Sequence, residues 1–387
     1  MTDASPRLFV TLIGDVDQEP FARVKYGCLL ESLRRAFPIE IRDATLRGLP
    51  RLFNALQVFS PDRRLWKERF YQNVPAFELR SASVARALRG QAGRVDLIFQ
   101  IGVLYDASRG NTGIPAVIYT DYTSVLSGRR PELGRSPLTP EERKRWIRLE
   151  QAAFQRAAHI CTRSEFVRAS VIADYGIPPE RVTAVGGGVN MTSLPALSSR
   201  AGTASPTVLF IGKDFYRKGG DILLRAFANV QMQLPGARLV MLTNGPLPAG
   251  LDLRGVEVIP PTWDRTFIHS LYQSADCFVL PSRLETWGDV LLEAMAFGLP
   301  CIGVSGEGMG EIITDPQNGL LVPPEDATAL AGALVRLLSD ANLRARMGGA
   351  ARQRIESQFT WDHVVARIYP ILMNAIQSSI VLKGRDA

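Results

Sequence analysis

The sequence is poor in the residues that build metal centres and disulfide frameworks. It has four cysteines, Cys28, Cys161, Cys277 and Cys301, and no two of them have the spacing of metal ligands. We expect these thiols to be reduced and buried, as in a cytosolic protein. Only three histidines occur, and they form no cluster with carboxylates along the chain. We therefore expect neither a catalytic metal nor a bound cofactor.

Long hydrophobic runs and targeting signals are also missing. No apolar run approaches the roughly 18–20 residues of a membrane span, and residues 1–7 lead into a strand-like segment without a signal-peptide pattern. With 46% hydrophobic and 21% charged residues, the composition is that of a soluble globular protein. The length of 387 residues favours two domains. These features predict a cytoplasmic protein.

The charge balance favours an anionic partner. Lys and Arg number 45 against 38 Asp and Glu, a formal net charge of +7, which suits a nucleoside diphosphate, an anionic membrane surface or nucleic acid. Nucleic acid fits least, because the basic residues are spread out and no nucleic-acid-binding motif occurs. Two basic segments with aromatic residues, 63–71 and 143–146, could lie on the inner face of an anionic membrane. The alternative, an ordinary solvated helix face, is the favoured interpretation of each segment.

The two halves of the chain repeat one pattern of alternating strands and helices. Strands are expected at residues 8–13, 39–41, 95–101, 116–120, 159–162, 181–185, 207–211, 237–242, 256–259, 277–280, 300–304 and 320–322. Helices are expected at 21–37, 61–72, 81–88, 141–156, 165–175, 220–233, 264–275, 287–297, 327–338, 341–358 and beyond 360. This alternation predicts an α/β protein with parallel sheets covered on both faces, and ligand sites at the carboxyl ends of the strands.

Composition also suggests where the domains divide. Residues 191–206 are rich in Ser, Ala and Pro and are expected to form a linker. We therefore expect an N-terminal domain at 1–190, a C-terminal domain at 207–360 and a final helix at 361–387.

The stretch from Val279 to Pro300 is the most informative part of the chain. It predicts a buried strand, a loop holding Glu285 and a helix in which Glu293 is the only charge between Val290 and Phe297. A carboxylate among apolar residues is costly to bury unless it is hydrogen-bonded, and two adjacent sugar hydroxyls would do this. The alternative is that Glu293 points outward at a polar edge.

A second segment is suited to binding phosphate. The strand ending at Ile211 leads into Gly212-Lys213-Asp-Phe-Tyr-Arg-Lys218-Gly-Gly220 and a helix. Glycines after a strand let the backbone approach a ligand, and a helix start favours an anion. Lys213 and Lys218 would stabilise a diphosphate as its bond to a sugar breaks. The alternative is a basic turn at the surface.

These segments together resemble the retaining glycosyltransferases of family four, which have the GT-B fold and a Glu-x7-Glu signature. Seven residues separate Glu285 from Glu293. Three further segments match elements of the family: Gly186–Asn190, Gly306–Glu311 and Asn318-Gly319. The similarity is dense over residues 207–359 and loose before them. It implies two Rossmann-like domains that face each other across a cleft, with the last helix packing back on the first domain.

The resemblance also assigns roles to matching positions. Glu293 would hold the ribose of a nucleotide sugar, and Lys213 and Lys218 its diphosphate. Glu285 would lie against the donor sugar. The remaining donor contacts would come from backbone at Gly14, Gly212, Trp287, Gly288 and Asp289, and the turn at 259–263 would face the base.

The chain departs from the family at several positions, among them Lys213, where the family more often has Arg, and one departure matters most. After the strand ending at Thr120 the family usually has a histidine facing the reacting sugar, and here Asp121 stands there. Asp121 could replace the histidine as a catalytic group, or it could cap the following segment.

The resemblance implies a cytoplasmic, metal-independent, retaining transferase. It would move a sugar from a nucleoside diphosphate sugar to a hydroxyl acceptor, for example in cell-envelope polysaccharide or glycolipid synthesis. A non-catalytic nucleotide-sugar-binding scaffold and an epimerase on the same fold are the alternatives. The sequence does not identify the sugar, the base, the acceptor or the oligomeric state.

Overall fold

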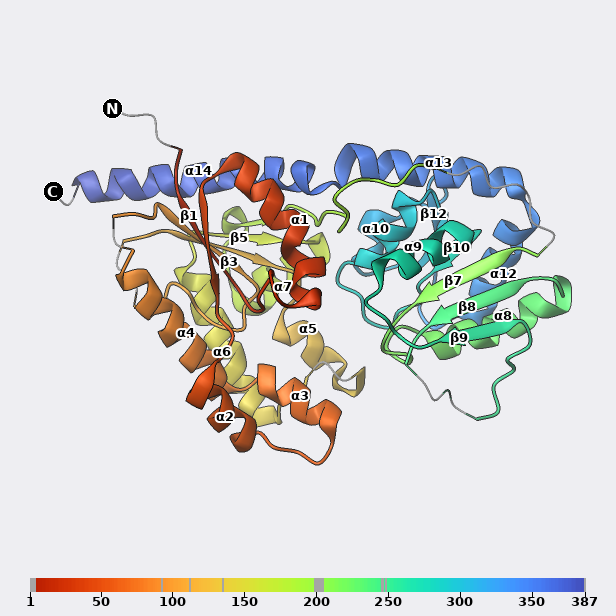
Figure 1. The fold of residues 1–387 in the computed structure, drawn as a ribbon, viewed down its shortest axis with the longest axis horizontal. Helices are drawn as coiled ribbons and strands as arrows, with labels where there is room; N and C mark the ends of the chain where they lie inside the picture. Colours follow the sequence, from red (N-terminus) through yellow and green to blue (C-terminus); the bar gives the residue numbers. More distant parts are fainter. Residues whose placement is uncertain are drawn as a thin grey trace. The chain divides into compact units, whose positions relative to one another are not determined.

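The chain forms two compact units in the computed structural model (Figure 1). The structure describes residues 5–91, 93–110, 113–133, 136–197, 205–244, 247 and 249–385. Unit 1 contains the residues up to Gly186 together with those from Val364 onward, and unit 2 contains Gly187–His363. The expected linker at 191–206 falls partly outside the described residues, at 198–204.

Unit 1 is built on a six-stranded parallel sheet in the order β2-β1-β3-β4-β5-β6. Its strands are β1 (Leu8–Leu12), β2 (Ile39–Asp43), β3 (Leu97–Ile101), β4 (Ala116–Thr120), β5 (His159–Thr162) and β6 (Val182–Ala184). Its helices are α1 (Pro20–Ala36), α2 (Gly48–Gln57), α3 (Arg63–Tyr71), α4 (Val74–Arg89), α5 (Ser124–Arg129), α6 (Pro140–Arg156) and α7 (Glu165–Tyr175). The central strands β1, β3 and β4 are buried at every position, as expected of a sheet covered on both faces.

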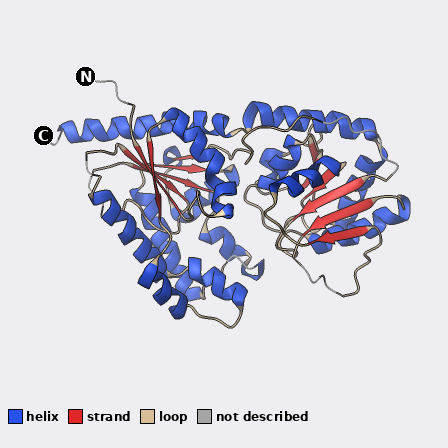
Figure 2. Cartoon of the chain, in the orientation of Figure 1, coloured by secondary structure: helices blue, strands red, loops and turns tan. Residues whose placement is uncertain are grey.

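Unit 2 has a second six-stranded parallel sheet, in the order β12-β11-β10-β7-β8-β9. Its strands are β7 (Thr207–Ile211), β8 (Arg238–Leu242), β9 (Val256–Ile259), β10 (Cys277–Val279), β11 (Cys301–Val304) and β12 (Gly319–Val322). Its helices are α8 (Gly220–Gln233), α9 (Arg265–Ser274), α10 (Asp289–Ala296), α11 (Met309–Ile312), α12 (Ala327–Ser339) and α13 (Ala341–Gln358). Helices surround the sheet of each unit (Figure 2), so the α/β prediction is confirmed.

The last helix, α14 (Trp361–Arg385), lies against unit 1 over most of its length. Tyr369 stacks on Phe37 at a ring-centroid distance of 5.0 Å, and the Arg367 guanidinium donates to the Val185 carbonyl at 2.7 Å. The stretch Ala341–Val381, which takes in α13 and most of α14, is by length and composition apolar enough to cross a bilayer. In its most apolar 18-residue segment, 33% of the residues are buried. The sequence prediction that nothing approaches a membrane span in length overlooked this stretch.

Three local expectations are wrong. The α4 helix begins at Val74 instead of residue 81, and Asn73 caps it by accepting from the Ala76 amide. Cys28 is only half-buried, whereas Cys161, Cys277 and Cys301 are buried as expected. The α10 helix begins at Asp289 instead of residue 287, because Gly288 has φ 113°, a left-handed value outside the helical range. In contrast, α7 begins at residue 165 as expected, and Ser164 caps it, since its side chain accepts from the Val167 amide.

Candidate donor site in unit 2

Two loops meet at the carboxyl ends of the neighbouring strands β7 and β10. Gly219 ends the first loop with φ 74°, and a Cβ built on it would overlap the carbonyl oxygen of Pro281 in the second loop. Only glycine fits both the left-handed backbone and this close approach. The Arg283 guanidinium fixes the same junction, since it donates to both Asp221 carboxylate oxygens at 2.7 and 2.8 Å.

The junction brings Lys218 and Glu285 together as an ion pair. The Lys218 Nζ bonds to Glu285 Oε2, and the two side chains are only 13% and 10% exposed. The Glu307 carboxylate accepts from the Glu285 amide, and the Gly308 amide donates to the Glu285 carbonyl at 3.2 Å. A Cβ on Gly308 would overlap the backbone of Thr286. Three loops therefore hold Glu285 in one place.

Glu293 is buried, with 5% exposure, so the alternative that it points outward at a polar edge is wrong. Arg265 Nη2 lies 3.0 Å from Glu293 Oε1, and the Tyr272 hydroxyl donates to Oε2 at 3.2 Å. Burial raises the pKa of Glu293 above its ordinary value, and Arg265 acts in the opposite direction. The protein therefore supplies one hydrogen-bonding partner to each oxygen of this buried carboxylate, and a carboxylate has the capacity to accept from further donors.

Lys213 contacts a different residue, Trp263. It is exposed, and its ammonium lies 5.9 Å from the ring centroid of Trp263, which is 51% exposed. Trp263 belongs to the turn expected to face a base, so a cation and an aromatic ring share this edge of the unit. Such a pair can hold the phosphate and the base of one nucleotide.

The amides at the start of α8 are less available than the sequence suggests. The Gly219 amide donates to Tyr216 O at 3.0 Å, and the Gly220 amide donates to Phe215 O at 2.8 Å. The loop folds back on itself and uses these N–H groups internally. The helix start is therefore not open to a phosphate at these two amides, and the positive charge of the loop lies in its lysine side chains.

Gly212, Trp287, Gly288 and Asp289 lie around the same loops. The Gly212 amide donates to Leu242 O at the carboxyl end of β8, at 3.0 Å, and is therefore already hydrogen-bonded within the protein. The Trp287 indole is 3% exposed and packs edge-on against Phe359 at 5.7 Å. Gly288 and Asp289 form the turn into α10.

Gly14 and Asp121 belong to unit 1, at the carboxyl ends of β1 and β4. The Gly14 amide donates to Asp43 Oδ1 at 3.0 Å and to Thr45 Oγ1 at 3.1 Å. Asp121 pairs with Lys25 of α1 at 3.2 Å. The cap of α5 is Thr123, whose hydroxyl accepts from the Leu126 amide at 3.3 Å, so the alternative that Asp121 caps this segment is wrong.

A buried carboxylate anchors the loop that follows Asp121. Glu150 accepts from the Ser124 amide at 3.1 Å, from the Ser124 hydroxyl at 2.8 Å and from the Trp146 indole at 2.9 Å. Burial raises the pKa of Glu150, although these hydrogen bonds act to lower it. The start of α5 is thus fixed from inside the unit.

An Asp-x-Asp triplet, Asp15-Val16-Asp17, has a pattern that can hold a metal ion and was not predicted as a site. In the structure Asp15 Oδ1 accepts from the amides of Asp17 and Gln18, at 3.0 and 3.2 Å. Asp15 Oδ2 pairs with Arg47 at 3.3 Å. The Asp15 carboxylate is therefore engaged in a turn and an ion pair.

Three residues of unit 2 that the sequence analysis did not single out complete the site: Arg265, Tyr272 and Glu307. Arg265 and Tyr272 reach Glu293 from α9, and Glu307 reaches Glu285 from the loop after β11. Their partners are distant in sequence, so no local pattern marks Arg265 or Tyr272. Glu307 lies in the segment Gly306–Glu311, which resembles the family, and this resemblance could have marked it as a site residue.

Comparison with known proteins shows which proteins the chain resembles. The model described as "Glycosyltransferase Family 4" matches residues 36–193, and the model described as "Glycosyl transferases group 1" matches residues 198–354. A D-inositol 3-phosphate glycosyltransferase of Salinispora arenicola is 28% identical over 351 residues, which are 81% of this chain and 75% of the relative.

Two further similarities extend the comparison. A glycogen synthase of Mycobacterium tuberculosis is 31% identical over 205 residues, 50% of each chain, so the match spans about half the length of that relative. The solved structure of sucrose-phosphate synthase from Thermosynechococcus elongatus has a TM-score of 0.67 at 19% identity, covering 96% of this chain and 100% of that one. The fold is thus that of the GT-B enzymes.

Proposed function

Because the chain belongs to family four of the glycosyltransferases, we propose that it transfers a sugar from a nucleoside diphosphate sugar to a hydroxyl acceptor. The transfer proceeds with retention of configuration at the anomeric carbon and without a metal ion. The acceptor is a glycan, a lipid-linked sugar or a small hydroxyl compound.

One observation carries this proposal: Lys218 and Glu285 pair at the junction of the β7–α8 and β10–α10 loops. When the bond between sugar and phosphate breaks, negative charge develops on the leaving diphosphate. A lysine ammonium fixed in a buried site stabilises that charge without reorganisation. Lys213 adds a second positive charge at the edge of the site.

Glu285 is suited to holding the donor sugar. Its carboxylate is paired with Lys218 and its backbone is tied to the loop that holds Glu307. A carboxylate placed this way accepts hydrogen bonds from sugar hydroxyls and orients the anomeric carbon. In the proposed mechanism the leaving phosphate takes the acceptor's proton, so the chain supplies positioning and charge.

Glu293 serves the other end of the donor in this proposal. Its carboxylate is held by Arg265 and Tyr272 inside unit 2. Both ribose hydroxyls of a nucleotide can donate to one carboxylate, which gives binding without a role in the bond that breaks. Asp121 is proposed as a contact of the reacting sugar from unit 1, in the place of the usual histidine.

The proposal is tested by following donor cleavage by proton NMR, with water as the acceptor, across a panel of nucleoside diphosphate sugars in the presence of a chelator. We expect one donor to be cleaved, and the released sugar to carry the donor's anomeric configuration before it mutarotates. Release of the opposite anomer would disprove retention. Activity that disappears with the chelator and returns with Mg²⁺ would disprove metal independence. Binding without cleavage would identify the non-catalytic alternative.

A further inference from the structure

Unit 1 carries an exposed apolar helix face that the proposed reaction does not use. On α2, Leu49, Leu52, Phe53 and Leu56 are 80%, 56%, 62% and 68% exposed, and Phe59 just beyond the helix is 64% exposed. The helical positions are spaced i, i+3, i+4 and i+7, which places them on one side of the helix. We call these five residues the α2 face.

The opposite side of α2 is already packed against the protein. Asn54 is fully buried and its amide donates to Phe70 O at 3.0 Å. The Trp66 indole of α3 donates to Ala55 O at 2.9 Å. The α2 helix is thus anchored by one side, and its larger apolar side chains point to solvent. Monomeric proteins rarely expose contiguous apolar surface of this kind without a partner.

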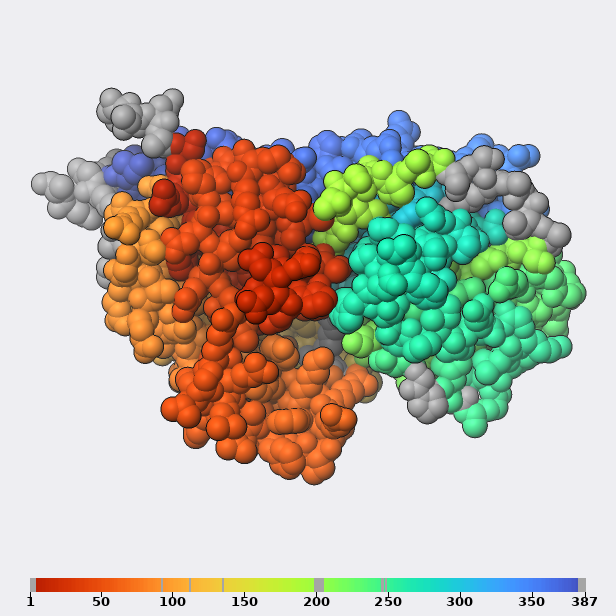
Figure 3. Space-filling model, in the orientation of Figure 1, coloured from red at the N-terminus to blue at the C-terminus, as the bar shows by residue number. Residues whose placement is uncertain are grey.

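Basic side chains accompany the α2 face. Arg63, Arg64 and Lys67 of α3 are exposed, and their spacing places them on one side of that helix. Residues 47–71 contain six basic and two acidic side chains, a net charge of +4. In Figure 3 this segment forms the orange-red surface of unit 1 where α2 and α3 lie.

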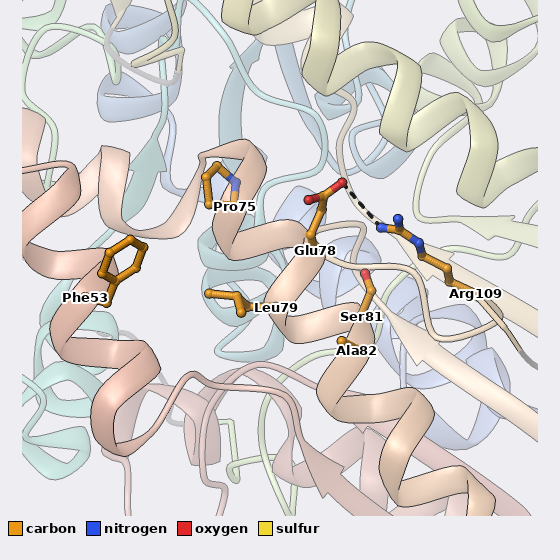
Figure 4. A pocket seen from close by; sticks show the side chains of 7 residues that line it. All are labelled: Phe53, Pro75, Glu78, Leu79, Ser81, Ala82 and Arg109. Atoms are coloured by element: carbon orange, nitrogen blue, oxygen red, sulfur yellow. Dashed lines mark ion pairs between the residues drawn. The ribbon is translucent and has the colours of Figure 1, made fainter.

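A pocket of about 500 Å³ opens beside the α2 face, between α2 and α4. Phe53, Pro75, Leu79 and Ala82 line it, and the ion pair of Glu78 with Arg109, 3.6 Å apart, lies at its edge (Figure 4). Because Phe53 belongs to both features, the apolar surface continues from the helix face into the pocket.

We propose that the α2 face inserts into the interface of an anionic phospholipid bilayer, with Arg63, Arg64 and Lys67 against the head groups. An amphipathic helix with aromatic and leucine side chains on one face and basic residues nearby binds such an interface by apolar burial and by charge attraction. A bilayer surface complements both features, whereas an acidic protein would complement only the charge.

The α2 helix also lies in the chain just after the carboxyl end of β2. Open α/β sheets bind their ligands at the carboxyl ends of their strands. Resting on the proposed function, this location indicates an acceptor that resides in the membrane.

The test is flotation of the full chain with vesicles of phosphatidylcholine alone, or of phosphatidylcholine mixed with phosphatidylglycerol. We expect binding to the mixed vesicles that weakens as salt rises. Leu52→Glu/Phe53→Glu should lower the partition coefficient about a hundredfold, and Arg63→Glu/Lys67→Glu at least about tenfold. The matched control is Met232→Glu, which charges a 71% exposed residue of α8 and should bind like wild type.

Two further measurements test the alternatives, which are a membrane contact through α14 and a dimer formed through the α2 face. Ile380→Glu charges a 65% exposed residue of α14; if it abolishes flotation while Leu52→Glu/Phe53→Glu does not, the membrane contact lies on α14 and the proposal fails. Sedimentation velocity without vesicles should show a monomer. A dimer that dissociates in Leu52→Glu/Phe53→Glu would assign the α2 face to a second copy of the chain and overturn the proposal. Donor cleavage, measured in parallel without vesicles, should be unchanged in these variants, so failure here is separable from failure of the proposed function.

Discussion

Replacing Lys218 with alanine is expected to lower the turnover number for donor cleavage by about 10²–10³-fold, with a smaller change in KM for the donor. The range is that seen when one preorganised group that stabilises developing charge is removed. Lys218 is only 13% exposed and is fixed against Glu285, so water cannot readily replace its charge. The measurement is release of nucleoside diphosphate from the saturating donor, with wild type and variant compared under the same conditions.

Two variants separate this effect from damage to the fold. Lys218→Ala also leaves Glu285 without its cation, and an uncompensated buried charge is destabilising. Lys218→Ala/Glu285→Gln removes that destabilisation and should cleave the donor no faster than Lys218→Ala, because Glu285 also holds the donor sugar. Lys213→Ala removes an exposed lysine that lies over Trp263, and we expect a loss of about tenfold at most. A folded Lys218→Ala variant that cleaves the donor at the wild-type rate would remove Lys218 from the mechanism.

Replacing Gly219 with alanine is expected to destabilise unit 2 by about 3 kcal/mol or more and to abolish donor cleavage. The added Cβ would occupy a left-handed position and overlap the Pro281 carbonyl, so the two loops must separate. Lys218 and Glu285 would separate with them. Urea unfolding followed by hydrogen exchange mass spectrometry measures the loss of unfolding free energy in each unit.

The matched control for this variant is Gly176→Ala. Gly176 also has a left-handed backbone, with φ 66°, but a Cβ there meets no atom within 4 Å. Gly176→Ala should lower the free energy of unfolding by only about 1 kcal/mol, which is the cost of placing alanine in a left-handed conformation. Equal losses at Gly176 and Gly219 would show that the contact between the two loops contributes nothing.

Much of the fold is predictable from local pattern, because buried parallel strands are continuous apolar runs separated by helices with their own caps. The strand at 207–211 and the helices at 220–233 and 341–358 were predicted with the bounds that the structure shows. Helices α2, α5 and α11 were not predicted. The α2 helix contains Gly48 and Pro50 and turns its apolar side to solvent, so neither its composition nor its burial resembles an ordinary amphipathic helix.

The candidate site is predictable only in part. The positions of Lys218 and Glu285 follow from their segments, but their pairing depends on the close approach of Gly219 to Pro281, a contact between distant parts of the chain. The pairing of Glu293 with Arg265 has the same origin. The internal use of the Gly219 amide is likewise invisible in sequence, because it depends on how the loop folds on itself.

The central claim, that unit 2 binds a nucleoside diphosphate through Glu293, is tested most directly by calorimetric titration of a panel of nucleoside diphosphates without added metal. The titrations compare wild type, Glu293→Ala and Asp252→Ala, a control that removes a carboxylate of the same unit that pairs with exposed Arg254. We predict that one diphosphate binds wild type and the control alike and binds Glu293→Ala about 10–100-fold more weakly, the loss expected for hydrogen bonds to a charged group. Equal affinity in all three proteins, with Glu293→Ala still folded, would contradict the assignment of Glu293 to the nucleotide site.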